Sequence, residues 1–251
     1  MPEQLPVLLV DNSNTRTKFA LSSGGRLNSA CGVLCLPTRS LDPRSVGGLL
    51  SSWRFGRVCI SSVVESSRPV LEDAFAGRPL RWVNAAVGGS VFDEYEGAAT
   101  LGADRIANVL AAVEYGRFPV VAVDMGTAVT FDVVAPGPRF LGGVIAPGLQ
   151  MMADALHAHT SLLPGVRAAA GPPRCIGGNT VEAMLAGARL SFAGMLENAM
   201  REIARELGAR PFCIATGGDS RCMGKCAPLF DVRDELLTLK GIALAAERAP
   251  W

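Results

Sequence analysis

The sequence predicts an α/β protein made of two related halves, and an internal repeat carries this prediction. Residues 7–21 and residues 120–134 each read as an apolar strand that ends at an acidic residue, followed by small and hydroxyl residues and a returning strand. Turns of this kind expose backbone N–H groups and hydroxyls, which suit phosphate oxygens. Two such turns predict a nucleotide held between two related domains.

In the first half, further strands are predicted near residues 29–36 and at 57–64. A loop with two adjacent glycines at 84–101 leads into a helix from Asp104 to about residue 115, with apolar residues at helical spacing. Gly116 and Pro119 close this helix. We therefore expect two domains, residues 1–117 and 118–251.

In the second half, the repeated strands are followed by an apolar stretch at 140–148, and helices are predicted at about 149–158, 180–207 and 233–249. A short strand with a glycine turn is predicted at 211–219. Strands precede helices in each half, which favours a duplicated α/β architecture over the βαβ alternation of a Rossmann fold. The sequence contains neither G-x-G-x-x-G nor G-x-x-x-x-G-K-[ST].

Composition narrows the class of protein. The 251 residues are 49% hydrophobic and 19% charged, so the body of the chain should fold around a sizeable core. A formal net charge of +1 argues against a nucleic-acid surface. No apolar run reaches the roughly 18 residues of a membrane span. The seven scattered cysteines, with no signal peptide recognised, favour reduced thiols and a cytoplasmic location.

The two turns carry candidate phosphate ligands. In the first, Asn14 and Thr15 offer side-chain donors and Lys18 offers a positive charge. In the second, Gly126 permits close backbone approach, and the Thr127 hydroxyl is placed to bond a phosphate oxygen. The alternative is an ordinary hairpin with structural polar residues in each case. The repetition favours the functional interpretation.

The stretch Gly102-Ala103-Asp104-Arg105 is the candidate catalytic turn. An aspartate at a helix N-terminus is often only a cap. Here the helix dipole and Arg105 are both expected to favour the ionised carboxylate. An ionised aspartate is suited to accept an alcohol proton during phosphoryl transfer, and an arginine is suited to pair with a substrate carboxylate.

Two further glycine turns are less specific. Thr216-Gly217-Gly218-Asp219 follows a strand and fits either a turn against a nucleobase or ribose or a simple strand-to-loop turn. Gly177-Gly178-Asn179-Thr180 opens the long helix, which predicts an N-cap by Asn179 or Thr180.

Taken together, these stretches resemble the type III pantothenate kinase family, which makes the first intermediate of bacterial coenzyme A synthesis. The resemblance spans nearly the whole chain and keeps the order of the family's motifs, which makes it specific where each motif alone is not. The matching stretches are 11–18, 60–64, 101–105, 124–130, 142–148, 176–180 and 216–219.

The resemblance implies a duplicated actin-like (ribonuclease H-like) ATPase fold with the nucleotide in the cleft between the domains. It also implies Mg²⁺ with ATP, and a monovalent cation, K⁺ or NH₄⁺, at Asp124, while Asp11 is a candidate magnesium ligand. The implied ATP-binding residues are Asp11, Asn12, Ser13, Asn14, Thr15, Arg16, Thr17, Lys18 and Thr127.

For the acceptor, the resemblance implies that Asp104 takes the proton from the pantothenate hydroxyl. It also implies a homodimer, with Thr180 contacting the pantothenate of the partner subunit. The remaining implied pantothenate-binding residues are Tyr95, Gly102, Ala103 and Arg105. Part of the apolar stripe in 181–207 is expected at the dimer surface, although such stripes also form cores.

Two departures from the family pattern leave alternatives open. Ser13 stands where the family usually has glycine, and residues 94–100 lack a proline often found before the Gly-Ala-Asp-Arg turn. If position 13 needs a positive φ, serine lowers the affinity for phosphate. The alternatives are a non-catalytic regulatory relative, or another small-molecule kinase or phosphatase of the same fold. Tyr95 and the turn at 102–105 favour the pantothenate kinase.

Overall fold

The first repeat forms the centre of a mixed sheet in the computed structural model, which describes residues 5–168, 175–248 and 251. Strand β1 (Val7–Asn12) pairs antiparallel with β2 (Arg16–Ser23) and parallel with β5 (Arg57–Ser62). The sheet order is β3-β2-β1-β5-β6, and β4 pairs with β2. The outer strands are β3 (Arg26–Leu27), β4 (Leu34–Pro37) and β6 (Leu80–Trp82).

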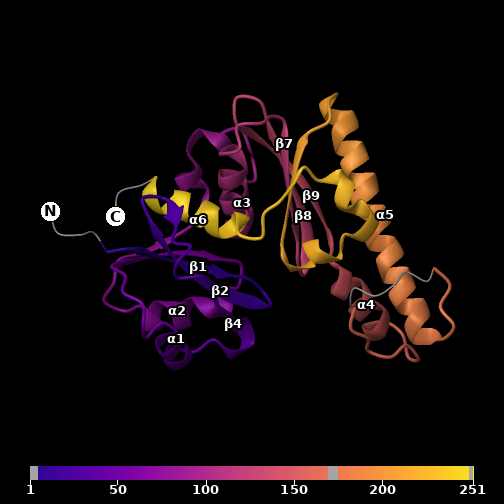
Figure 1. Ribbon diagram of the computed structural model, residues 1–251, viewed down its shortest axis with the longest axis horizontal. Coiled ribbons are helices and arrows are strands. Elements are labelled where there is room, and N and C mark those ends of the chain that lie inside the picture. Colours follow the sequence, from indigo (N-terminus) through magenta and orange to yellow (C-terminus); the bar gives the residue numbers. More distant parts are fainter. Residues whose placement is uncertain (1–4, 169–174, 249–250) are drawn as a thin grey trace. The chain divides into compact units, whose positions relative to one another are not determined.

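Helices cover both faces of this sheet (Figure 1). Because strand side chains alternate, Leu8 and Val10 of β1 pack on one face against α1 (Pro43–Leu49) and α2 (Arg68–Ala74). On the other face, α6 (Leu237–Glu247) packs against β1 and against α3 (Ala103–Val113). The two helices approach so closely that a Cβ on Gly241 would lie 1.8 Å from the carbonyl oxygen of Ala107.

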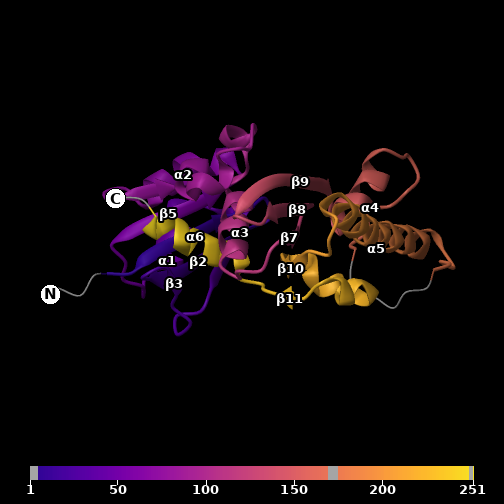
Figure 2. The same cartoon turned by 90° about the horizontal axis from the view of Figure 1, so that it is seen from above.

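The second repeat forms a second sheet with the order β11-β10-β7-β8-β9. Figure 2 shows β7, β8 and β9 side by side, with β10 and β11 next to them. Strand β7 pairs antiparallel with β8 and parallel with β10. The strands are β7 (Val120–Met125), β8 (Ala128–Ala135), β9 (Arg139–Pro147), β10 (Phe212–Thr216) and β11 (Val232–Arg233).

The long helix α5 (Thr180–Leu207) packs on one face of the second sheet. Its residues Phe192 and Leu196 share a core with alternate residues of β7 and β8, including Phe131. In both views α5 lies beside α4 (Leu149–Ala158), and the two helices are in contact (Figures 1 and 2). The apolar stripe of α5 therefore belongs mainly to the chain's own core.

Contacts divide the chain into two units. The first contains residues 1–116, 137–141 and 236–251, and the second contains residues 117–136 and 142–235. The C-terminal helix thus packs with the N-terminal half. The functional division between residues 117 and 118 stays a prediction.

The repeat in the sequence is a repeat in the structure. Each copy is an antiparallel hairpin whose first strand also has a parallel neighbour, β5 in one sheet and β10 in the other. Asp11 lies opposite Lys18, and Asp124 lies opposite Thr130. Among the described residues, no helix has both the length and the apolar character needed to cross a bilayer.

The candidate active site

The first turn, residues 13–15, is built around a buried carboxylate. Asp11 is only 2% exposed at the end of β1. Its Oδ2 accepts from Lys18 Nζ at 3.2 Å, and its Oδ1 accepts from the Ser13 hydroxyl at 2.9 Å. Asn14 and Thr15 are exposed at the tip, next to Arg16 at the start of β2. The turn therefore combines an anchored carboxylate and amine with an exposed tip.

Serine is compatible with position 13. No non-glycine residue of the described chain has a positive φ, so Ser13 does not occupy the left-handed region that would call for glycine. Its backbone N–H donates to the carbonyl oxygen of Arg16 at 3.1 Å. The conformational cost considered from the sequence does not arise here.

Asn12 is buried beneath the turn. Its side chain is 1% exposed, with Oδ1 accepting from the Ser62 hydroxyl at 2.6 Å and Nδ2 donating to Thr17 Oγ1 at 2.8 Å. Thr17 is itself fully buried. The side chains of Asn12 and Thr17 thus support the turn from below.

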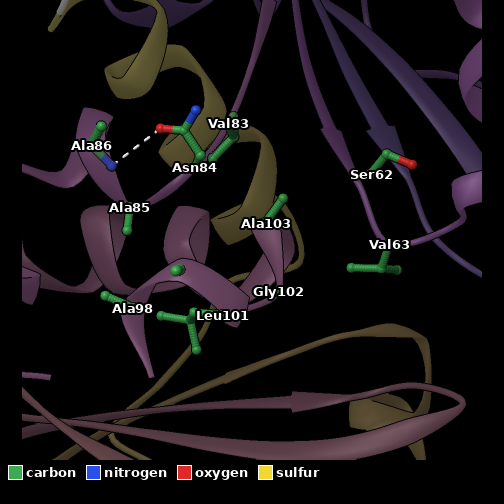
Figure 3. Close-up of a pocket in the computed structure, with 11 residues that line it drawn as sticks. Ser62, Val63, Val83, Asn84, Ala85, Ala86, Ala98, Leu101, Gly102 and Ala103 are labelled. Atoms are coloured by element: carbon green, nitrogen blue, oxygen red, sulfur yellow. Dashed lines mark hydrogen bonds between the residues drawn. The ribbon is translucent and has the colours of Figure 1, made fainter. Parts of the chain in front are cut away.

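A pocket of about 620 Å³ opens in the first unit, within the size range of small-molecule sites. Figure 3 shows its walls: Ser62 is the last residue of β5, Val63 follows it, and the segment around Asn84 lies opposite. Asn84 Oδ1 accepts from the backbone N–H of Ala86 at 3.1 Å, which fixes that segment. The lining residues are Ser62, Val63, Val83, Asn84, Ala85, Ala86, Ala98, Ala99, Leu101, Gly102 and Ala103.

Asp104 lies in the first turn of α3, directly after two residues of the pocket wall. The backbone N–H of Arg105 donates to Asp104 Oδ1 at 2.7 Å. Burial raises the pKa of the Asp104 carboxyl, the negative charge of Asp11 raises this pKa further, and Arg105 lowers it. The net shift is upward, so desolvation outweighs the helix end and the arginine that were expected to favour ionisation.

Tyr95 and Arg105 meet on one aromatic ring, that of Phe140. The rings of Tyr95 and Phe140 are 4.8 Å apart between centroids and inclined by 69°. The Arg105 guanidinium carbon lies 5.8 Å from the centroid of Phe140, within cation–π range. Two of the predicted pantothenate-binding side chains are thus held by a third residue from the start of β9.

The second turn, Gly126-Thr127, is held by backbone packing. Thr127 is exposed, and its carbonyl oxygen accepts from the N–H of Gly148 at 3.0 Å. A Cβ on Gly148 would lie 2.0 Å from the carbonyl oxygen of Gly126. Only glycine fits at position 148, where the chain enters α4.

Asp124 lies against a third glycine. Gly217, at φ 86°, packs so closely that a Cβ there would lie 2.4 Å from Asp124 Oδ1 and from the carbonyl oxygen of Met125. Two residues on, the Asp219 carboxylate accepts a hydrogen bond from the backbone N–H of Leu149, at the start of α4. Burial nevertheless raises the pKa of Asp219. The turn at 216–219 therefore packs onto the second phosphate turn.

Thr180 is the first residue of α5 and is exposed. Asn179 is the N-cap, and its Oδ1 accepts from the N–H of Glu182 at 3.0 Å. The predicted cap is confirmed at Asn179, and the Thr180 hydroxyl is not needed for it.

Three residues with contacts to the predicted site received no role from the sequence alone, although one of them, Ser62, lies in the matching stretch 60–64. They are Thr38, which bonds the Ser13 carbonyl, Ser62, which bonds Asn12, and Phe140, which holds Tyr95 and Arg105. Thr38 and Phe140 lie 25 and 45 residues from Ser13 and Tyr95, so no local pattern joins them. Ser62 could have been suspected as a hydroxyl at a strand end.

The donors at the two strand ends fit hard cations. Asp11 and Asp124 are each the penultimate residue of a central strand, and carboxylate oxygens are ligands that Mg²⁺ and K⁺ accept. Asp11 already contacts Lys18, so this carboxylate is compensated by a positive charge. Among the described residues, no cluster of three or more acidic, histidine or cysteine side chains suggests an all-protein metal cage.

Comparison with solved structures supports the fold. A Campylobacter jejuni protein described as a Baf family transcriptional activator aligns over 96% of this chain and 97% of its own, with a TM-score of 0.59 and 20% identity. An inorganic polyphosphate/ATP-glucomannokinase from Arthrobacter aligns over 97% of both chains, with a TM-score of 0.51 and 17% identity. With the repeated sheets, these likenesses confirm the duplicated actin-like fold.

Sequence comparison identifies the family. Residues 7–202 match the profile described as type III pantothenate kinase. A protein of that name from Akkermansia muciniphila is 38% identical over 239 residues, covering 95% of this chain and 97% of the relative. Another from Acidothermus cellulolyticus is 36% identical over 252 residues, covering 96% and 98%. This chain belongs to the type III pantothenate kinase family.

Proposed function

We propose that this chain transfers the γ-phosphoryl group of ATP to the hydroxyl of pantothenate, forming 4′-phosphopantothenate for coenzyme A synthesis. Membership of the family supports this proposal. The observation that carries it lies in the first unit, where a substrate-sized pocket ends at Gly102 and Ala103, next to Asp104. Asp11, in the phosphate turn, is close enough for its charge to raise the pKa of Asp104.

Asp104 is the proton acceptor in this proposal. The pantothenate oxygen forms its bond to the γ-phosphorus while the bond from that phosphorus to the β–γ bridging oxygen breaks. The acceptor hydroxyl passes its proton to the Asp104 carboxylate. Desolvation raises the pKa of this carboxyl and so makes its ionised form a stronger base.

The remaining site residues have different proposed roles, according to the chemistry of their side chains. The turn at 11–18 and Thr127 bind the phosphates, and Lys18 supplies positive charge there. Asp11 would hold the Mg²⁺ that enters with ATP, and this ion would neutralise charge on the phosphate oxygens. Asp124 would hold the monovalent cation. Tyr95 and Arg105, positioned by Phe140, bind the acceptor.

A homodimer is part of the proposal. In the second unit, apolar side chains of β9, α4 and α5 remain exposed, which favours a partner surface there. These side chains are Val144, Ile145, Met151, Val181 and Leu190, with exposed fractions of 40% or more. Thr180 begins the helix that carries two of them, and it contacts pantothenate across the dimer. Analytical ultracentrifugation should find a dimer.

We also place this activity in the cytoplasm, because seven cysteines are an odd number and suit a reducing compartment.

The deciding experiment measures ADP release by the full chain with MgATP and pantothenate, first in sodium and then in potassium buffer. We expect ADP formation that requires pantothenate and increases with potassium. Mass spectrometry should identify the phosphorylated product. If a folded protein released no pantothenate-dependent ADP in either buffer, the function would instead be regulatory or directed to another acceptor.

A further inference from the structure

A continuous chain of side-chain hydrogen bonds runs beneath the first phosphate turn, from the loop after β5 to the carbonyl of Ser13. We call its four side chains, Ser62, Asn12, Thr17 and Thr38, the hydrogen-bond chain. At the β5 end, the backbone N of Val64 lies 3.2 Å from Ser62 Oγ, and Ser62 Oγ lies 2.6 Å from Asn12 Oδ1. In the middle, Asn12 Nδ2 lies 2.8 Å from Thr17 Oγ1. At the turn end, Thr17 Oγ1 lies 3.1 Å from Thr38 Oγ1, and Thr38 Oγ1 lies 2.6 Å from the carbonyl oxygen of Ser13.

The two ends of the hydrogen-bond chain determine its direction. The carbonyl oxygen of Ser13 only accepts, so the Thr38 hydroxyl donates to it, and the Thr17 hydroxyl in turn donates to Thr38. At the other end, the side-chain oxygen Oδ1 of Asn12 only accepts, so the Ser62 hydroxyl donates to it and itself accepts from the backbone N–H of Val64. The hydroxyl protons of Thr17 and Thr38 therefore each have one assigned acceptor. The Ser62 hydroxyl is 2.6 Å from Asn12 Oδ1 and also lies 3.3 Å from the carbonyl oxygen of Val64. Asn12 and Thr17 are 1% and 0% exposed, so water does not replace these partners readily.

Thr38 holds the phosphate turn from two sides. Its hydroxyl bonds the Ser13 carbonyl, and its backbone N–H donates to the carbonyl oxygen of Thr15 at 3.1 Å. Thr38 lies just after β4, outside every motif that identifies the family. The turn at 13–15 is thus fixed by a residue that does not belong to it.

Ser62 joins the same hydrogen-bond chain to the pocket. Ser62 and Val63 line the pocket wall, and a Cβ on Gly102 would lie 3.7 Å from Val63 Cγ1. The segment at one end of the hydrogen-bond chain therefore lies beside the turn that carries Asp104, in the wall of the same pocket. Both ends lie within the first unit.

We propose that Thr38 and Ser62 are positioning residues for phosphoryl transfer, which act through the hydrogen-bond chain to hold the 13–15 turn in its phosphate-binding conformation. This inference rests on the proposed function. Because phosphoryl transfer depends on positioning, a turn that loses its internal anchor binds ATP less well. Removing one partner also leaves a buried polar group without its bond.

The test compares Thr38→Val, which removes the hydroxyl at nearly constant shape, with Thr38→Ser, which keeps the hydroxyl. We expect Thr38→Val to raise the KM for ATP by about tenfold, with the KM for pantothenate changed by less than about twofold. Thr38→Ser should stay within about twofold of the wild type for both. A structural defect alone would not separate the two KM values.

Two adjacent serines, Ser61 and Ser62, provide a test of the other end of the hydrogen-bond chain. Ser61, next to Ser62 on β5, is 1% exposed, and its hydroxyl has no hydrogen-bond partner among the described residues. Ser61→Ala therefore removes a buried hydroxyl outside the hydrogen-bond chain, whereas Ser62→Ala removes one within it. Only Ser62→Ala should raise the KM for ATP. Its effect should be less than multiplicative with that of Thr38→Val, because both interrupt one network.

Hydrogen exchange provides a readout that does not depend on the kinase activity. Amide exchange in a peptide spanning 11–17 should accelerate in Thr38→Val and Ser62→Ala, and not in Thr38→Ser or Ser61→Ala. If exchange and the KM for ATP were unchanged in Thr38→Val, or if Thr38→Ser were equally impaired, the proposal would be wrong. If the wild type lacked pantothenate-dependent activity, the proposed function would fail, and with it the role in phosphoryl transfer, whatever the exchange result.

Discussion

The two phosphate turns are copies in topology and differ in what holds them. The first turn is supported by side chains: Ser13 and Lys18 bond Asp11, and Thr38 bonds the backbone of the turn. The second is supported by backbone packing, because Gly148 and Gly217 approach it to distances that exclude a Cβ. One hairpin design is thus stabilised by two kinds of contact.

Because of this difference, we expect the two turns to be sensitive to different kinds of substitution. The first should respond to loss of a hydroxyl or a charge, because its contacts are hydrogen bonds and one ion pair. The second should respond to addition of a methyl group at Gly148 or Gly217, because these glycines pack too closely against it to leave room for a Cβ. A further asymmetry is electrostatic, since Asp104 interacts with the charge of Asp11.

The largest effect is expected from Asp104→Asn, which removes the proposed proton acceptor. Turnover should fall by about 10²- to 10⁴-fold, because an amide does not accept the hydroxyl proton. Steady-state ADP release measures this loss, and circular dichroism checks that the variant is folded. Turnover close to that of the wild type would remove Asp104 from the base role.

Gly217→Ala should break the second turn. Its methyl group would lie 2.4 Å from Asp124 Oδ1 and from the Met125 carbonyl, at a φ of 86°. We expect the free energy of unfolding in urea to fall by about 3 kcal/mol. Gly126→Ala is the matched control, because its Cβ would meet only the Ala128 carbonyl oxygen at 3.8 Å. An equal loss in both variants would contradict the steric explanation.

Asp124→Ala should remove the response to potassium. Without this carboxylate the ratio of activity in potassium to that in sodium should fall to about one. Asp11→Ala is the comparison, since it should weaken activity in both buffers and leave the ratio intact. If Asp124→Ala responded to potassium like the wild type, the cation would have to be placed elsewhere.

Asp11→Asn should shift the pH dependence of kcat/KM for pantothenate. In the proposed mechanism the ionised form of Asp104 is the active one, so activity should be lost as the pH falls through its raised pKa. Asp11 contributes to this raised value, so neutralising Asp11 lowers the pKa of Asp104 and moves the acid limb to lower pH. Asp124→Asn is the control and should leave the acid limb of the pH profile unchanged. If Asp124→Asn shifted the acid limb as much as Asp11→Asn does, the shift could not be attributed to the charge of Asp11.

The smallest effect is expected from Ser13→Gly. The serine hydroxyl bonds Asp11, which also bonds Lys18, and position 13 has no positive φ for glycine to relieve. The KM for ATP should therefore change by less than about threefold. A large increase would show that the hydroxyl itself binds phosphate.

The local sequence pattern was sufficient to predict an element where that element is long or repeated. The helices at 149–158 and 180–207 have the predicted bounds, and the paired hairpins were visible as a repeat. Short elements were missed: α1 and α2 have seven residues each, and β6 has three. Asp42, which caps α1 before Pro43, was an available signal. Too few residues were present in these elements for periodicity to be seen.

By itself the sequence determined the family, the repeated hairpins and the candidate residues within contiguous motifs, because these depend on neighbours along the chain. Only the tertiary structure decided that α6 packs with the first unit, that Phe140 joins Tyr95 to Arg105, and that Thr38 anchors the 13–15 turn. It also decided the sign of the pKa shift of Asp104, because desolvation depends on everything that surrounds a group in space.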